Sequence, residues 1–324
     1  MDKNNLSFIS SFKHMKRFIT KTVFLILLPV IVGVIVCEIF LRRIPNDYAY
    51  KNEWLTNSSD SVQILNLGSS HAFFGIDPSL FSCKAFNAAH VSQSIKYDHF
   101  IFSKFVNEMD SLQVLVLPVS YGSFFGFGPE NGIEDWRVKY YSIYYHCKYH
   151  RFEPKYNLEI YSGLHFKNVL YSMLGKTSHR TCNDLGYGTT YQLRYRAEDW
   201  KESGAIAAKR HTKKSIDTII LEKNKNLIED MIAVCKKRHI QVIIVTTPTY
   251  QSYRDSLDKK QLDISVECCN EFAKHVNVCY LDLLDDKRFT EDDFFDADHL
   301  NEYGAAKLTG ILQQTIDSLG ILQN

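Results

Sequence analysis

Two short clusters at opposite ends of the chain carry side chains that can work together in catalysis. Gly68-Ser69-Ser70-His71 follows an apolar run, and Asp296-Ala297-Asp298-His299 lies near the C-terminus. A serine hydroxyl is a poor nucleophile at neutral pH, so it needs a histidine to take its proton and a carboxylate to orient that histidine. The two clusters supply all three groups. They predict nucleophilic serine chemistry, with the nucleophile arriving from the end of a strand.

The elements that must position these residues follow the rhythm of a parallel sheet, because apolar strand-like runs alternate with helical patterns. The predicted strands are 62–67, 84–87, 112–118, 241–247 and 278–283, and the predicted helices are 94–109, 214–237, 257–275 and 302–319. This order predicts a doubly wound, flavodoxin-like α/β fold with a parallel five-stranded sheet, whose active sites lie beyond the carboxyl ends of the strands. Ser70 follows one such end, and Asp296 and His299 lie between the last strand and the last helix.

Residues 121–211 interrupt this rhythm between the third and fourth strands, and we interpret them as an insertion. The stretch is rich in tyrosines, which include Tyr140, Tyr141, Tyr144, Tyr145, Tyr149, Tyr156, Tyr161, Tyr171, Tyr187, Tyr191 and Tyr195. One interpretation is a helical insertion that packs its rings on the core. The other is a lid or carbohydrate-binding wall, because a tyrosine offers sugars an apolar face and a hydroxyl. Both can hold together.

The N-terminal region predicts a membrane anchor. Residues 22–40 are apolar except for Glu38 and are about long enough to cross a hydrocarbon core, so we expect one transmembrane helix there. We expect residues 1–21 to be a cytoplasmic N-terminus, residues 41–60 to form a polar stalk and residues 61–324 to form the folded domain.

Two alternatives to an uncleaved anchor are a buried helix of a soluble domain and a cleaved signal peptide. A buried helix would have to be apolar on all faces, and Arg42 and Arg43 stand where a signal peptide would have a small-residue cleavage site. The basic residues before the apolar stretch are Lys3, Lys13, Lys16, Arg17 and Lys21, against Arg42, Arg43 and Lys51 after it. The positive-inside rule therefore predicts that the large domain lies on the outer side, periplasmic or extracellular.

Composition excludes some classes of function. The chain of 324 residues has 38 Lys and Arg against 37 Asp and Glu, so nothing favours binding to nucleic acid. Its eight cysteines form neither a Cys-x-x-Cys pair nor a zinc-ligand spacing, and we interpret them as ordinary buried residues. A disulfide between Cys147 and Cys182 stays open for an exported domain. No motif implies a cofactor.

The two clusters resemble the motifs of the SGNH (GDSL-like) hydrolases, and among them the membrane-anchored relatives that handle acyl groups on cell-envelope polymers. Members carry a Gly-Asp-Ser block after the first strand and an Asp-x-x-His block near the end. Ser69 replaces the Asp here, a variant similar to the D-alanyl transfer proteins of teichoic acid synthesis and to polysaccharide O-acetylation proteins. The second block matches well and is followed by Leu300, Asn301 and Gly304. The resemblance covers roughly residues 62–319 outside the insertion.

The resemblance implies an SGNH-like fold in which Ser70 is the nucleophile, His299 is the base and Asp296 orients His299. Asp298 is the alternative orienting residue, although side chains of adjacent residues generally diverge. The backbone N–H of Ser70 would contribute to an oxyanion hole. Without this chemistry, Ser70 would simply cap the helix that follows the strand.

Two more oxyanion donors are implied by the family's second and third blocks. Ser92 fills the position of the second-block Gly and offers its backbone N–H. The third-block Asn has no counterpart after the third strand, where residues 118–122 read Pro-Val-Ser-Tyr-Gly, so Ser120 and Asn87 are the candidate substitutes. This departure puts ordinary esterase activity in question.

Several histidines also need an interpretation. His71 and His90 are expected near the site, and a zinc site built from them with Asp298 is an alternative that the lack of ligand spacing on one helix disfavours. The other histidines, including His146, His150 and His211, are interpreted as surface or structural residues.

These patterns lead to two functional hypotheses. The first is a membrane-anchored, outward-facing esterase or O-acyltransferase that attacks an ester of an acylated glycan or other envelope polymer through Ser70. A membrane acyl-donor protein is a candidate partner. The second is a non-catalytic envelope protein that keeps the fold and binds a glycan or a membrane partner. Hydrolase and transferase share the first half-reaction, so the sequence does not separate them.

Overall fold

The computed structural model describes residues 3–126, 128–129, 132, 134–148, 152–162, 170–171, 174–175 and 178–321. Tyr149 and His150 of the predicted insertion lie outside these residues. The chain divides into two compact units, one formed by Met1–Pro45 with Phe152–His179 and the other by Asn46–Arg151 with Arg180–Asn324. The second, larger unit contains the sheet and both sequence clusters.

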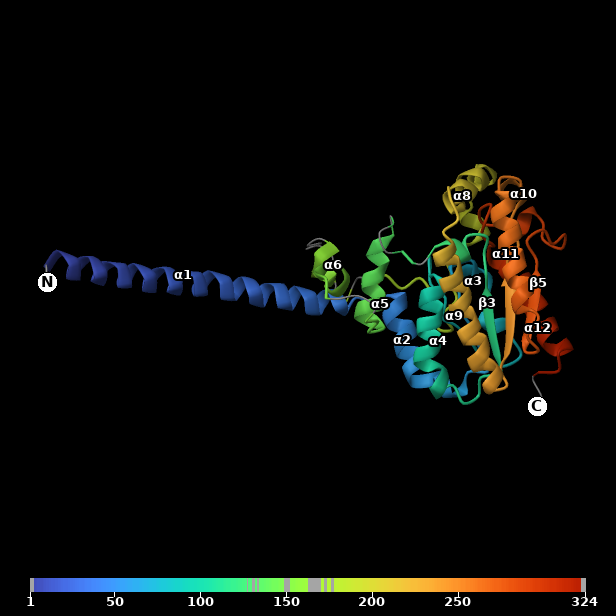
Figure 1. Ribbon diagram of the computed structural model, residues 1–324, viewed down its shortest axis with the longest axis horizontal. Helices are drawn as coiled ribbons and strands as arrows, with labels where there is room; N and C mark the ends of the chain where they lie inside the picture. The colour runs from blue at the N-terminus through green and yellow to red at the C-terminus, as the bar shows by residue number, and fades with distance from the viewer. Residues whose placement is uncertain are drawn as a thin grey trace. The chain divides into compact units, whose positions relative to one another are not determined.

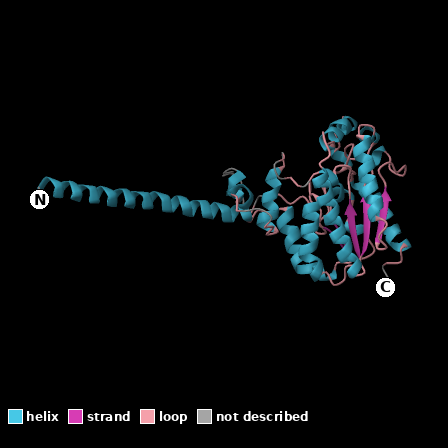
Figure 2. Ribbon diagram, viewed as in Figure 1, coloured by secondary structure: helices cyan, strands magenta, loops and turns pink. Residues whose placement is uncertain are grey.

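The sheet of the larger unit has five strands in the order β2-β1-β3-β4-β5, and every neighbouring pair is parallel (Figure 2). The strands are β1 (Ile64–Asn66), β2 (Ala85–Asn87), β3 (Val114–Pro118), β4 (Gln241–Thr246) and β5 (Val278–Asp282). The predicted doubly wound fold is confirmed. Because the chain leaves β1 for one neighbour and later returns to the other, the strand order reverses at β1, and a site is expected beyond the carboxyl ends of β1 and β3.

Alternate side chains of the strands pack into two hydrophobic layers, one on each face of the sheet, because successive residues of a strand point to opposite faces. Leu65 and Leu115 face one layer, whereas Ile64 and Val114 face the other. Helices α4 and α9 lie side by side over the first face (Figure 1). The helices of this unit are α2 (Asp47–Ser58), α3 (Ser70–Gly75), α4 (Ile95–Phe105), α5 (Val138–Tyr144), α8 (Ser203–His211), α9 (Thr218–Lys237), α10 (Gln251–Arg254), α11 (Lys259–Phe272) and α12 (Glu302–Ser318).

Helix α9 illustrates how the sequence specifies these elements. Its N-cap is Asp217, whose carboxylate accepts hydrogen bonds from the backbone N–H groups of Ile219 and Ile220. Ile228, Ile232 and Cys235 recur at helical spacing and are buried against the sheet. The helix begins at Thr218 and ends at Lys237, so the predicted span 214–237 starts a few residues too early.

The predicted stalk, residues 41–60, is wrong. Helix α2 occupies most of it and packs into the core through Leu55 and Tyr48, both buried. Lys51 is also buried and donates a hydrogen bond to the carbonyl oxygen of Ala89. The polar composition of this stretch gives no sign that one face of the helix is buried. The larger unit therefore begins at Asn46 rather than at residue 61.

The predicted insertion, residues 121–211, is not one body. Tyr121, Tyr141 and Tyr145 are buried in the larger unit, as the core-packing interpretation expects. Residues 152–179 instead belong to the smaller unit. Cys147 and Cys182 are not joined by a disulfide in the structure.

The smaller unit contains α1 (Lys3–Arg42), α6 (Pro154–Asn157) and the short 3-10 helix η6 (Glu159–Ser162). The part of α1 from Lys13 to Arg42 is long and apolar enough to cross a membrane. The predicted span 22–40 lies within it. Pro29 sits in the middle of this helix, where a membrane helix tolerates proline.

Candidate active site

The turn after β1 brings the nucleophile candidate to the edge of the sheet. Gly68 has a φ of 114°, in the region that only glycine adopts readily, and a Cβ there would lie 3.2 Å from Ala72 Cβ. The chain then enters α3, of which Ser70 is the first residue. Its hydroxyl points to His299 and does not cap the helix.

The second cluster is held by the loop between β5 and α12. Asn301 caps α12 by accepting hydrogen bonds from the N–H groups of Tyr303 and Gly304. Gly304 packs directly on the backbone of Asp293 and has no room for a side chain. The carbonyl oxygen of His299 accepts a hydrogen bond from the N–H of Phe295 at 2.9 Å, which fixes the turn that carries the histidine.

The structure brings Ser70, His299 and Asp296 together in one hydrogen-bonded chain. Ser70 Oγ lies 2.8 Å from His299 Nε2, and His299 Nδ1 lies 2.9 and 3.1 Å from the two carboxylate oxygens of Asp296. Asp296 Oδ1 also accepts the backbone N–H groups of Asp298 and His299, at 3.1 and 2.8 Å. These bonds orient the carboxylate and, through it, the imidazole.

Asp298 is the more distant of the two carboxylates from the His299 ring. Its Oδ1 lies 3.4 Å from His299 Nδ1, longer than either Asp296 distance, so Asp296 is the orienting residue in this geometry. Burial lowers the pKa of His299, but the charges of Asp298 and Asp296 outweigh it and raise that pKa well above 6.5. The same interaction, with help from His71 and His211, overcomes the effect of burial on Asp298 and lowers its pKa.

A second row of similar groups runs beside the first. Ser69 Oγ lies 3.2 Å from His71 Nδ1, and His71 Nε2 lies 4.0 Å from Asp298 Oδ2. The ring of His71 stacks on the ring of His299, with centroids 4.7 Å apart. Burial lowers the pKa of His71 to about 3, and the charge of His299 acts in the same direction. His71 is therefore a neutral imidazole at neutral pH.

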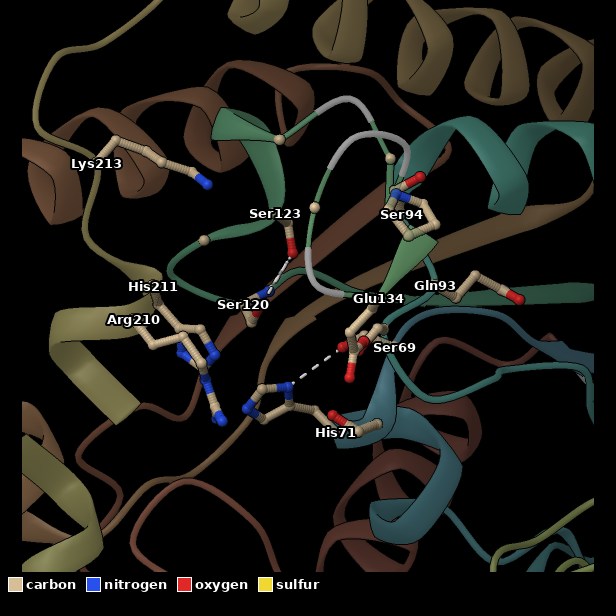
Figure 3. A pocket seen from close by; sticks show the side chains of 17 residues that line it. Ser69, His71, Gln93, Ser94, Ser120, Ser123, Glu134, Arg210, His211 and Lys213 are labelled. Carbon is tan, nitrogen blue, oxygen red and sulfur yellow. Dashed lines mark hydrogen bonds between the residues drawn. The ribbon is translucent and has the colours of Figure 1, made fainter. Parts of the chain in front are cut away.

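A cavity of about 290 Å³ opens beside Ser70. Figure 3 shows Ser69, His71, Ser120 and Glu134 among the residues that line it, with Arg210 and His211 together on one side. These residues come from the ends of β1 and β3, from the segment before α5 and from the end of α8. The sequence missed His211, which was interpreted as surface or structural. It lines this cavity, and its Nδ1 lies 3.9 Å from Asp298 Oδ2.

The oxyanion candidates differ in what they can offer. As the first residue of α3, Ser70 has a backbone N–H that the helix itself does not use. Ser92 lines the same cavity with a φ of 58°, a conformation that suits the glycine of the family's second block. Both can present backbone donors to the cavity.

The other two candidates are engaged elsewhere. The N–H of Ser120 lines the cavity but already donates to Ser123 Oγ at 2.9 Å. The amide nitrogen of Asn87 donates to the carbonyl oxygens of Ala72 and Ile76, and its oxygen accepts the N–H of Ala89. Asn87 thus fixes the end of α3 to the sheet, and its buried side chain has no free donor among the described residues.

Two further residues of the site lacked a sequence signal. Asp98 of α4 is buried and accepts hydrogen bonds from the N–H of Gly68 and from Gln93 Nε2, both at 2.7 Å. Burial raises its pKa to about 7. Tyr191 from the predicted insertion presents its ring at right angles to that of His299, 5.3 Å away. Only the fold reveals that these residues adjoin the two clusters.

The predicted zinc alternative is not the arrangement found. His90 stacks on Tyr48 at 3.9 Å and lies 3.0 Å from the hydroxyl of Tyr145, within an aromatic cluster. His71, Asp298 and His299 do place ligand atoms within 4.8 Å of one another. Both nitrogens of His299 are engaged by Ser70 and Asp296, which leaves two ligands instead of the three usual at a catalytic zinc.

Comparisons with known proteins give structural neighbours but no sequence relative. No family model and no curated protein matches the chain. A GDSL-like lipase from Bacteroides thetaiotaomicron is 10% identical over 84% of this chain and 99% of its own, with a TM-score of 0.39. A protein of the G-D-S-L family from Desulfitobacterium hafniense is 11% identical over 78% of this chain and 98% of its own, with a TM-score of 0.39.

These identities and TM-scores are low, and we draw no conclusion about activity from them. The activity must be inferred from the residues of the site.

Proposed function

We propose that this protein is a membrane-anchored serine enzyme that handles acyl groups, as an esterase or an O-acyltransferase. The observation that carries the proposal is the continuous chain from Ser70 through His299 to Asp296 at the edge of an open cavity. Such a chain activates a hydroxyl that would otherwise be inert at neutral pH.

In the first half-reaction, Ser70 Oγ attacks the carbonyl carbon of an ester while its proton passes to His299 Nε2. The backbone N–H groups of Ser70 and Ser92 would stabilise the negative charge on the carbonyl oxygen. As the tetrahedral intermediate collapses, the bond to the alcohol oxygen breaks and His299 returns the proton to that oxygen. An acyl group then remains on Ser70.

In the second half-reaction, an acceptor hydroxyl gives its proton to His299 and attacks the acyl carbonyl. Ser70 Oγ leaves and regains its proton. Water as acceptor gives hydrolysis, and a glycan hydroxyl gives transfer. The cavity supports a polar acceptor, because Glu134, Arg210 and His211 line it beside Ser70.

The candidate membrane helix α1 supports an envelope substrate. We propose that α1 holds the larger unit on the outer, periplasmic or extracellular side, where an acylated glycan or other polymer would be the substrate. Tyr191 stacks between Phe74 and Phe295, at 3.7 and 4.1 Å, and meets the ring of His299 at right angles, so it supports the histidine from the side of the predicted insertion. A membrane protein that supplies acyl groups is the proposed partner.

The test measures where the acyl group goes. The full chain in detergent is given an activated acetyl ester with and without an oligosaccharide acceptor, and free acetate and acetylated sugar are both quantified. We expect Ser70→Ala to abolish both products. An unchanged yield of both products from Ser70→Ala would contradict the proposal.

A non-catalytic glycan-binding or partner-binding protein is the second candidate. It is favoured by the engaged N–H of Ser120, which leaves the third oxyanion position without the asparagine of the family. This candidate predicts no product in the assay above and an unchanged affinity for oligosaccharide in Ser70→Ala. Isothermal titration would detect this binding, and the absence of both products from the native chain would separate the binding function from the catalytic one.

A further inference from the structure

The smaller unit contains a segment that is fastened to the last turns of α1. Glu38 accepts hydrogen bonds from the backbone N–H groups of Glu159 and Ile160, at 3.1 and 2.9 Å. Arg42 donates to the carbonyl oxygen of Asn157 at 2.8 Å. Ile160 also packs against the buried side chains of Leu41 and Ile44. We call the described residues 152–162, 170–171 and 174–175 the docked segment.

The docking point coincides with the end of the apolar stretch of α1. Residues 22–40 rise about 28 Å as a helix, close to the hydrocarbon thickness of about 30 Å. Glu38 and Leu41 therefore mark the level at which the hydrocarbon ends. A carboxylate at this depth is costly unless it is paired, and Glu38 is satisfied by Arg42 at 2.7 Å as well as by the two backbone donors.

The docked segment, which these contacts hold against the end of α1, exposes large apolar side chains. Phe152 is 71% exposed, Tyr161 61%, Leu174 57% and Leu170 49%. Leu170 and Leu174 belong to one turn, because the N–H of Leu174 donates to the carbonyl oxygen of Leu170. A group of exposed apolar residues usually marks an interaction surface, and aromatic residues are enriched where a membrane protein meets the lipid headgroups.

We infer that the docked segment lies in the lipid interface of the bilayer that α1 crosses, with Tyr161 and Leu174 among the upper parts of the acyl chains. The partner is a phospholipid surface. We choose this partner because the segment is hydrogen-bonded to Glu38 and Arg42, which lie where α1 emerges from the hydrocarbon core. Lys155, whose ammonium lies over the ring of Tyr156 and 3.7 Å from Glu153, adds a cation to the same segment. The inference rests on the proposed membrane anchoring and not on the acyl chemistry.

Tryptophan fluorescence of the full chain in lipid nanodiscs tests the inference. New tryptophans are introduced one at a time by Tyr161→Trp and Leu174→Trp in the docked segment, Leu27→Trp in α1 and Tyr303→Trp in α12. Tyr303 is a matched control for Tyr161, because it is an equally large side chain that is 59% exposed. Nanodiscs made with brominated lipids quench tryptophans that contact the acyl chains, and the signal of the native chain is subtracted.

We expect the fluorescence added by Tyr161→Trp and Leu174→Trp to fall at least about twofold in brominated lipid, as expected for side chains in the interface. Bromines near the glycerol ends of the chains should quench them more than bromines near the methyl ends. Leu27→Trp should show the opposite preference, and Tyr303→Trp should not be quenched.

Two results would overturn the inference in distinguishable ways. If Leu27→Trp is quenched but Tyr161→Trp and Leu174→Trp behave like Tyr303→Trp, α1 crosses the bilayer and the docked segment does not touch it. If Leu27→Trp is not quenched either, the anchoring itself is wrong. The acetyl-transfer assay at Ser70 is independent of both results.

Discussion

Two rows of serine, histidine and aspartate run side by side in this protein, and only one of them is continuous. In the Ser70 row, the contacts from Ser70 to His299 and from His299 to Asp296 are 2.8 and 2.9 Å. The Ser69 row, which consists of Ser69, His71 and Asp298, has contacts of 3.2 and 4.0 Å. The same three residue types therefore give a proton path in one row and a gap in the other.

The charges of the two rows differ as well. Both carboxylates act on His299 and raise its pKa well above 6.5, whereas burial lowers the pKa of His71 to about 3. Two positive charges on stacked imidazoles 4.7 Å apart would repel each other in a buried site, and His299 is the ring on which the carboxylates favour the imidazolium that forms when Ser70 gives up its proton. Residue types alone do not define a triad; contact distances and the local field do.

The largest expected effect separates the two serines. Ser70→Ala removes the group that attacks the ester, so kcat/KM should fall by at least about three orders of magnitude. Ser69→Ala should retain activity within about tenfold, because its hydroxyl hydrogen-bonds to His71 and not to His299 in the described part of the chain. Steady-state kinetics on an acetyl ester compare the two variants. Equal losses would mean that both rows take part in the reaction.

The next largest effect separates the two carboxylates. Asp296→Asn places an amide against His299 Nδ1 and no longer favours the tautomer that accepts the proton of Ser70, so kcat should fall on the order of a thousandfold. Asp298→Asn leaves the contact between Asp296 and His299 intact and should cost far less. The reverse order of the two losses would identify Asp298 as the orienting residue.

The effect of Asp298 should appear in the pH profile. His299 must be neutral to accept a proton, so activity falls as the pH drops through its raised pKa. Removing the negative charge of Asp298 disfavours the imidazolium and lowers that pKa, so Asp298→Asn should move the acidic limb of kcat/KM to lower pH by about one unit. An unchanged limb, or a limb moved to higher pH, would show that Asp298 does not act on His299.

The smallest effect concerns His71. His71→Phe keeps a ring stacked on His299 and removes the imidazole nitrogens, one of which lies 4.0 Å from Asp298. Because this separation is too long for a hydrogen bond, we expect kcat/KM to change by less than about fivefold. Activity and thermal unfolding are measured together, so that a loss of activity in a well-folded variant would reveal a direct role for His71.

The sequence predicts the sheet well because its pattern is local. The strands are short apolar runs such as 114–118, buried on both faces, and the helices between them have clear periodicity. The prediction of a stalk at residues 41–60 is wrong because α2 is polar overall. The few side chains that it buries, such as Leu55, do not form a recognisable apolar pattern. Only tertiary packing makes this segment part of the core.

The residues of the site also fall into those that a local motif predicts and those that only the fold brings together. Ser70, Asp296 and His299 occur in short motifs, so the sequence can name them. Asp98, Tyr191 and His211 reach the site from α4, from a loop and from the end of α8, and no local pattern marks them. The approach of Asp298 to His71, at 4.0 Å, depends on two turns that meet in space, which a sequence does not display.

The most direct test of the account is to locate a covalent adduct. The full chain is treated with a fluorophosphonate, digested and analysed by mass spectrometry, with Ser70→Ala and Ser69→Ala as controls. Both serines lie in one peptide, so fragment ions must distinguish them. The account predicts an adduct on Ser70 that persists in Ser69→Ala and disappears in Ser70→Ala. An adduct on Ser69, or equal labelling of all three proteins, would contradict it.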